Sequence, residues 1–119
     1  MTTGMIDNVN LKTSLSGGAL VALFKCQKIG DFEAPPLRAE IESLAGQAGW
    51  KIVADLSNVM LLGSQGIGML VTLKKSCDAN KGKLIICGLS DELMGLLKIA
   101  ALTKLFNIRK DVAEALRSF

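Results

Sequence analysis

Residues 55–68 have the sequence DLSNVMLLGSQGIG, and the glycines in this stretch are the most informative residues of the chain. A buried strand that ends near Leu56 is predicted to lead into a helix that begins at or beside Ser64. Gly66 and Gly68 then lie near the start of that helix, where each costs about 1 kcal/mol relative to alanine. This cost indicates a compensating role, either close packing of the helix against a sheet or access of a partner or an anionic group to free backbone N–H groups.

The glycine spacing over residues 63–68 is G-x-x-G-x-G. The dinucleotide-binding pattern is G-x-G-x-x-G, and a P-loop needs a Lys followed by Ser or Thr, which does not occur here. A nucleotide cofactor is therefore not predicted. A small anionic ligand held at the Gly63–Gly68 turn stays open as an alternative.

The residues before this stretch predict two strands, a helix and a third strand. Residues 9–14 alternate between apolar and polar side chains, which is typical of a half-buried strand, and the SGG at 16–18 supplies a hairpin turn. Residues 19–26 (ALVALFKC) form an apolar run that is expected at the centre of the sheet. A helix is predicted over 35–47, because its two prolines suit a first turn, and a strand covered on both faces over 51–56.

The residues after the stretch predict further elements in alternation. The helix that begins near Ser64 is expected to end at Asn80, and KLIIC at 83–87 repeats the buried-strand pattern. Ser90 is a predicted N-cap, with two acidic residues behind it in the first turn of the next helix. A short strand near 105–108 and an amphipathic turn or two over 111–119 complete the chain.

The predicted order is β-β-α-β-α-β-α-β-α, which favours one α/β domain over residues 1–119. Each β-α-β step places its strands parallel, and the hairpin adds an antiparallel pair, so a mixed sheet of four or five strands with about four helices is expected. Half of the 119 residues are hydrophobic and 21% are charged, which excludes extended disorder. No apolar run approaches the ~20 residues that span a bilayer, and no leader pattern opens the chain, so a cytoplasmic protein without membrane insertion is predicted.

The chain contains no histidine. This removes the commonest general base and the usual zinc ligand, so neither an enzyme nor a metal site is predicted. The three cysteines, Cys26, Cys77 and Cys87, are odd in number and lie in apolar surroundings, which favours buried free thiols.

The net charge of +3 arises from 14 basic and 11 acidic residues that are scattered along the chain. No basic stripe forms, and the chain has no Tyr, one Trp and four Phe on which bases could stack. Nucleic-acid binding is therefore not predicted.

The helix that follows the glycines has one predicted apolar stripe, formed by Ile67, Leu70, Leu73 and Cys77. Met69 falls outside this stripe and is expected to point outward, where a methionine suits a docking surface for another protein. A role for Met69 in filling a gap under a neighbouring loop stays open.

Taken together, these motifs resemble a STAS domain, the domain of sulphate transporters and anti-sigma factor antagonists. The resemblance covers residues 9–116. It is carried by DLSNV at 55–59, the S-x-G-I-G helix start at 64–68, GKLIICGLS at 82–90, and the segment 96–108.

The resemblance implies a non-enzymatic switch in partner binding. Stand-alone members of the family bind an anti-sigma factor that is also a serine kinase, and this frees a sigma factor for transcription. The kinase then phosphorylates a Ser or Thr at the start of the second helix, and a phosphatase reverses the reaction. A phosphate adds about −1.5 to −2 charges at pH 7, which disrupts a docking surface by repulsion and desolvation.

This sequence departs from the family's motif of Asp, Ser, acceptor and Gly. Aligned on Gly66, the first three positions are Gly63, Ser64 and Gln65, so the acceptor position holds a residue that cannot be phosphorylated. Ser64 is either a displaced acceptor or a plain N-cap worth about 1 kcal/mol. The acid that the family carries before its first helix corresponds to Asp31 after a shift of one position.

The resemblance, together with Gln65 at the acceptor position, therefore implies that an anti-sigma factor binds constitutively, through a surface around the start of the second helix. The predicted contact residues are Asp31, Gly63, Ser64, Gln65, Gly66, Gly68 and Met69. A role as accessory subunit of a membrane transporter or signalling scaffold stays open. The first strand, 8–14, is a candidate edge for pairing with a second copy in a homodimer.

Overall fold

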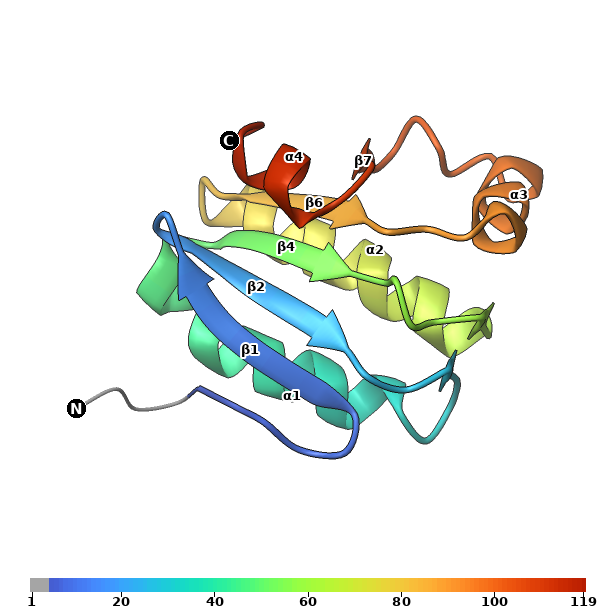
Figure 1. Cartoon of the computed structure of the whole chain (residues 1–119), viewed down its shortest axis with the longest axis horizontal. Coiled ribbons are helices and arrows are strands. Elements are labelled where there is room, and N and C mark those ends of the chain that lie inside the picture. Colours follow the sequence, from blue (N-terminus) through green and yellow to red (C-terminus); the bar gives the residue numbers. More distant parts are fainter. Residues whose placement is uncertain (1–4) are drawn as a thin grey trace.

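The computed structural model describes residues 5–119. Within that range seven strands, four α-helices and one 3-10 helix follow one another (Figure 1). They are β1 (Leu11–Ser16), β2 (Ala19–Phe24), β3 (Lys28–Ile29), α1 (Ala34–Ala45), η1 (Gly46–Ala48), β4 (Lys51–Asp55), β5 (Leu61–Leu62), α2 (Ser64–Ala79), β6 (Lys83–Cys87), α3 (Asp91–Ile99), β7 (Asn107–Arg109) and α4 (Val112–Leu116).

The main sheet has five strands in the order β1-β2-β4-β6-β7. β1 pairs antiparallel with β2, and every other pair in this sheet is parallel. This confirms the predicted mixed α/β architecture. The central strand is β4, however, and β2, which was expected at the centre, lies beside it.

Helices cover both faces of the sheet, which explains why the buried residues 52–54 of β4 and 84–87 of β6 are all apolar. α1 and α2 pack on one face over the larger core, which contains Ile52 and Leu84 (Figure 1). The short α4 packs on the other face, where its Ala115 belongs to a small buried cluster that includes Val53 and Ile85. Side chains alternate across a strand, so neighbouring residues of β4 serve the two cores in turn.

The β1–β2 hairpin forms as predicted, with Gly17 and Gly18 both at positive φ (58° and 82°), as a two-residue hairpin turn of this type requires. β1 begins at Leu11, so the expectation that Val9 belongs to the buried face of the strand is wrong. The Asn8 side-chain oxygen accepts hydrogen bonds from the N–H groups of Asn10 and Leu11 at 3.0 and 2.9 Å. This turn interrupts the strand pattern and leaves Val9 exposed.

The free edge of β1 is partly covered by the chain's own N-terminal segment. Thr13 N–H donates to the Ile6 carbonyl at 2.7 Å, and Ile6 N–H donates to Thr13 Oγ1 at 2.8 Å. A salt bridge of 3.0 Å between Lys25 and Asp7 holds the same segment. A second copy could pair along 8–14 only by displacing these bonds.

Two predicted boundaries and one predicted stripe shift. The 35–47 helix begins at Ala34, with both prolines in its first turn, and its last turn is the 3-10 helix η1. β7 begins two residues later than expected and ends one residue later. The spacing of Leu93, Leu96, Leu97 and Ala100 predicts a buried stripe on α3. Leu93 and Leu97 are buried and Leu96 is half-buried, whereas Ala100 lies beyond the helix and is exposed.

β3 and β5 were not predicted. They pair in parallel to form a separate two-stranded sheet, in which Lys28 lies opposite Leu61 and Ile29 opposite Leu62. Two residues are too few for a detectable alternation. The pair joins the segment before α1 to the segment before α2, and the candidate site lies there.

Candidate protein-binding site

The loop before α1 and the start of α2 are held side by side. Gly63 N–H donates to the Ile29 carbonyl at 2.9 Å. The loop that follows Ile29 is closed by Glu33, whose carboxylate accepts from Gly30 N–H at 2.9 Å, and by Ala34 N–H, which donates to the Gly30 carbonyl at 3.0 Å. The exposed Asp31 therefore lies in a loop anchored next to the start of α2, although the two segments are far apart in the sequence.

The two glycines at the start of α2 differ in their surroundings. A Cβ at Gly66 would lie 2.5 Å from the Ile29 carbonyl oxygen, so Gly66 permits the close approach of α2 to β3. A Cβ at Gly68 would have no atom within 4 Å. Close packing therefore explains Gly66 and leaves Gly68 unexplained.

Ser64 is exposed and is the first residue of α2, not its N-cap. The N-cap is Gly63, which makes no side-chain capping bond, and the first turn contains no acidic residue. The interpretation of Ser64 as a plain N-cap is therefore wrong. Gln65, the next residue, is also exposed, so the start of α2 is polar, uncharged and open to a partner.

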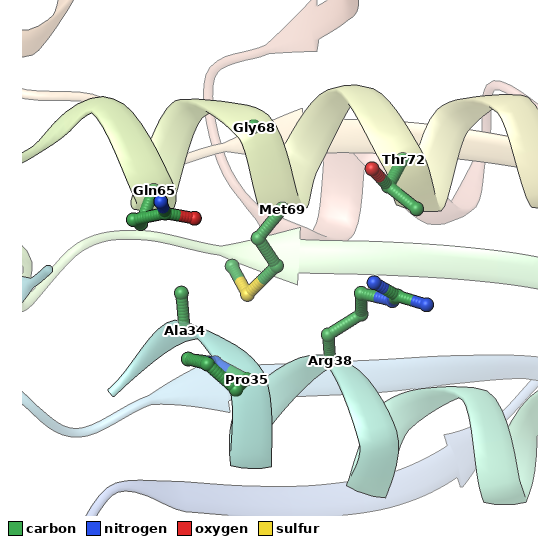
Figure 2. A pocket seen from close by; sticks show the side chains of 7 residues that line it. All are labelled: Ala34, Pro35, Arg38, Gln65, Gly68, Met69 and Thr72. Carbon is green, nitrogen blue, oxygen red and sulfur yellow. The ribbon is translucent and has the colours of Figure 1, made fainter. Parts of the chain in front are cut away.

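Met69 is 3% exposed, so the expectation that it points outward is wrong. It lies on the side of α2 that faces α1, where it fills the space between the two helices (Figure 2). α2 thus has a second buried side besides the stripe that packs on the sheet. The periodicity of α2 alone could not show it, because that side is buried by α1.

Beside Met69 lies a hollow of about 210 Å³ between α1 and α2, which we term the α1–α2 groove (Figure 2). It is lined by Ala34, Pro35 and Arg38 of α1 and by Gln65, Gly68, Met69 and Thr72 of α2. Arg38 and Thr72 were not singled out in the sequence. They lie on different helices, and the sequence does not show that these two helices pack side by side.

Three apolar side chains at the same end of the molecule are 62–89% exposed. They are Phe32, in the loop before α1, and Met60 and Leu61, at β5. Large exposed apolar side chains are informative where they gather beside a candidate binding surface. With Asp31 and the exposed start of α2, they form a surface that we term the docking end.

The thiols take no part in this site. Burial raises the pKa of Cys77 and of Cys87 to about 12, so both stay protonated and unreactive near neutral pH. Cys26 is only half-buried, in contrast to the predicted burial, and desolvation raises its pKa as well. Within residues 5–119 no three potential ligands from Asp, Glu and Cys come together to hold a metal ion.

A family model for the STAS domain matches residues 28–115. The chain belongs to the STAS domain family. The match includes the β3–β5 pair, both helices of the groove and α3. The resemblance of its motifs to this family is thereby confirmed.

Proteins similar to this STAS domain include anti-sigma factor antagonists. The anti-sigma-B factor antagonist of Listeria monocytogenes is 28% identical over 89 residues, which cover 75% of this chain and 78% of the relative. The crystal structure of an anti-sigma factor antagonist from Mycobacterium paratuberculosis has a TM-score of 0.79 at 21% identity and covers 91% of each chain. The anti-sigma factor antagonist SpoIIAA in its unphosphorylated form has a TM-score of 0.70 at 15% identity, over 92% of this chain and 99% of that one. These structures share the fold of the STAS domain described here.

None of the helices in the described part of this STAS domain is long and apolar enough to cross a membrane.

Proposed function

We propose that this STAS domain is an anti-sigma factor antagonist, a non-enzymatic protein that binds an anti-sigma factor and so frees a sigma factor. Its kinship with the Listeria antagonist supports the class of partner. The observation that carries the proposal is the exposed, uncharged start of α2, which lies beside Asp31 and three exposed apolar side chains at the docking end. An anti-sigma factor as the partner implies a cytoplasmic location.

Binding through this surface is constitutive in the proposal, because Gln65 occupies the position where the family carries its phosphoacceptor. An amide has the polarity of an unmodified hydroxyl, and it cannot receive the phosphate that adds about −1.5 to −2 charges. An anti-sigma factor with kinase activity would therefore find no acceptor at residue 65.

In a second version of this proposal, Ser64 is the residue that the kinase phosphorylates. Its hydroxyl is exposed and does not cap the helix, so it is accessible to a kinase. A phosphate on Ser64 would lie in the first turn of α2, one residue from the usual acceptor position. The switch would then persist in displaced form.

The first experiment is affinity purification of the chain from its native cells, followed by mass spectrometry of the bait and of the retained proteins. An anti-sigma factor on the beads, with an unmodified bait, is the expected result. Phosphate on Ser64 would replace the constitutive version with the displaced switch. Retention of transporter subunits instead of an anti-sigma factor would overturn the proposal.

The second experiment places a charge at the docking end. We expect Gln65→Glu to weaken the anti-sigma factor complex by about tenfold, which corresponds to about 1.4 kcal/mol, through repulsion and desolvation of the carboxylate. Isothermal titration calorimetry with the purified partner measures this. Gln47→Glu is the matched control, because Gln47 is also exposed but lies in η1, after the last residue of α1. An unchanged dissociation constant for Gln65→Glu would remove residue 65 from the interface.

A further inference from the structure

The α1–α2 groove contains an arginine whose position is set by its neighbours. Arg38 Nε donates to Glu42 Oε1 at 3.2 Å, and the other carboxylate oxygen of Glu42 accepts from Ser76 Oγ of α2 at 3.2 Å. This chain of bonds crosses from α1 to α2 and holds the Arg38 guanidinium between the two helices. Figure 2 shows Arg38 directed from α1 toward α2, near Thr72.

The bond to Glu42 uses only one of the five N–H groups of the guanidinium. The four N–H groups on its terminal nitrogens have no hydrogen-bond partner among residues 5–119, and the side chain is 49% exposed. Two terminal nitrogens in one plane match the two oxygens of a carboxylate. Arg38 therefore presents a pre-oriented donor pair at the mouth of the groove.

Gly68 provides the second, independent observation. It lies on the exposed side of α2, lines the groove, and has no neighbour that would collide with a Cβ. A glycine inside a helix costs about 1 kcal/mol relative to alanine, and no contact within the described chain accounts for it. A bare backbone at this point lets another molecule approach α2 closely.

We propose that the α1–α2 groove receives an acidic side chain of the partner protein, with its carboxylate on the terminal N–H groups of Arg38 and its carbon chain over Gly68 and Met69. The charges favour this occupant, because among the described residues that line the groove Arg38 is the only charged one and the others are neutral. A free anion is disfavoured, since the charge of a half-exposed arginine that is already paired with Glu42 attracts a solvated ion weakly. A carboxylate on a docked protein binds more strongly, because the rest of the protein interface adds its contacts to the attraction by Arg38. The inference rests on the proposed function and identifies the chemistry of the partner's contact.

The test uses the full chain and the purified anti-sigma factor that the wild-type chain retains from its own cells. Arg38→Ala is expected to raise the dissociation constant at least tenfold, whereas Arg117→Ala, which removes the same charge from an exposed position after α4, changes it less than twofold. Gly68→Ala is expected to raise it about tenfold. Gly95→Ala is its matched control, because Gly95 also lies within a helix, α3, and a Cβ there also meets nothing within 4 Å.

Thermal unfolding separates a binding effect from a folding effect. Both glycine variants should melt at or above the wild-type temperature, because alanine favours the helix. Weaker binding by a Gly68→Ala chain of undiminished stability supports the proposal. If the wild-type chain binds the anti-sigma factor and both Arg38→Ala and Gly68→Ala leave the dissociation constant within twofold, the groove is not part of the interface and the proposed function stands without it.

A charge reversal tests the carboxylate. Arg38→Glu should abolish binding. Replacing one acidic residue of the anti-sigma factor with Arg should then lower the dissociation constant for the Arg38→Glu chain at least tenfold. If no acidic residue of the partner shows such coupling, the proposed occupant is wrong. If the wild-type chain binds no anti-sigma factor at all, the proposed function fails and this inference fails with it, so wild-type binding distinguishes the two failures.

Discussion

The starts of α2 and α3 are two helix N-termini in one fold with opposite construction. At α3, Ser90 Oγ accepts from Leu93 N–H at 3.1 Å, and Asp91 and Glu92 occupy the first turn, where the helix dipole favours negative charge. At α2, the N-cap is Gly63, with no capping side chain and no acid in the first turn.

The difference separates a helix start that stabilises the fold from one that remains open to a partner. Every feature at the start of α3 satisfies a backbone group or the dipole within the chain. The start of α2 leaves such groups unsatisfied by side chains and carries two glycines, yet it lies next to exposed apolar residues and a groove with an oriented arginine. The helix start that lacks local stabilisation is therefore the one that lies at the surface proposed to bind the partner.

The change with the largest expected effect on stability is Gly66→Ala. A Cβ at this position would lie 2.5 Å from the Ile29 carbonyl oxygen and 3.1 Å from Ile29 Cγ2. The backbone of β3 or α2 would have to shift, and we expect the free energy of unfolding to fall by about 2–3 kcal/mol, despite the better helix propensity of alanine. Urea unfolding followed by circular dichroism measures the loss.

Gly68→Ala is the control for this measurement, because it makes the same chemical change on the same helix. It should raise the free energy of unfolding by up to about 1 kcal/mol. Equal stability of the two variants would show that α2 does not approach β3 as closely as the bond between Gly63 and Ile29 requires.

The second comparison uses the two serines. Ser90→Ala should lower the free energy of unfolding by about 1 kcal/mol, because Leu93 N–H loses its acceptor. Ser64→Ala removes no capping bond and should change it by less than about 0.5 kcal/mol. Urea unfolding of both variants under the same conditions measures the two changes in the free energy of unfolding. A Ser64→Ala loss as large as that of Ser90→Ala would mean that Ser64 caps α2 in solution.

The same contrast explains how far the sequence could predict the molecule. Signals that act within a few residues were sufficient at β6, whose bounds Lys83–Cys87 match the prediction, and at the cap of α3. The hairpin turn and the two-sided burial of β4 also follow from local composition.

Features that depend on which elements meet were not predictable in this way. The periodicity of α2 identifies its largest apolar stripe, but the burial of Met69 depends on α1 lying beside it. β3 and β5 are two residues each, and the pairing of one gives the other its conformation. The groove around Arg38 is likewise a product of two helices. Packing between distant elements thus forms the groove and the β3–β5 pair, whereas the glycine motif alone identifies the start of α2.

The smallest expected effect comes from supplying α2 with the cap that it lacks. Gly63 has φ −79° and ψ 178°, which any residue adopts, and a Cβ there would meet its nearest atoms at 3.7 Å. Gly63→Asp should therefore raise the free energy of unfolding by about 0.5 kcal/mol, since aspartate caps better than glycine by a few tenths and its charge faces the positive end of the helix. Gly63→Asn is the matched variant, because it offers the same acceptor without the charge. The difference between the two variants should shrink in ~1 M salt, where the dipole is screened. If both variants are less stable than the wild type, the start of α2 has no vacant capping position, and the contrast with α3 must have another origin.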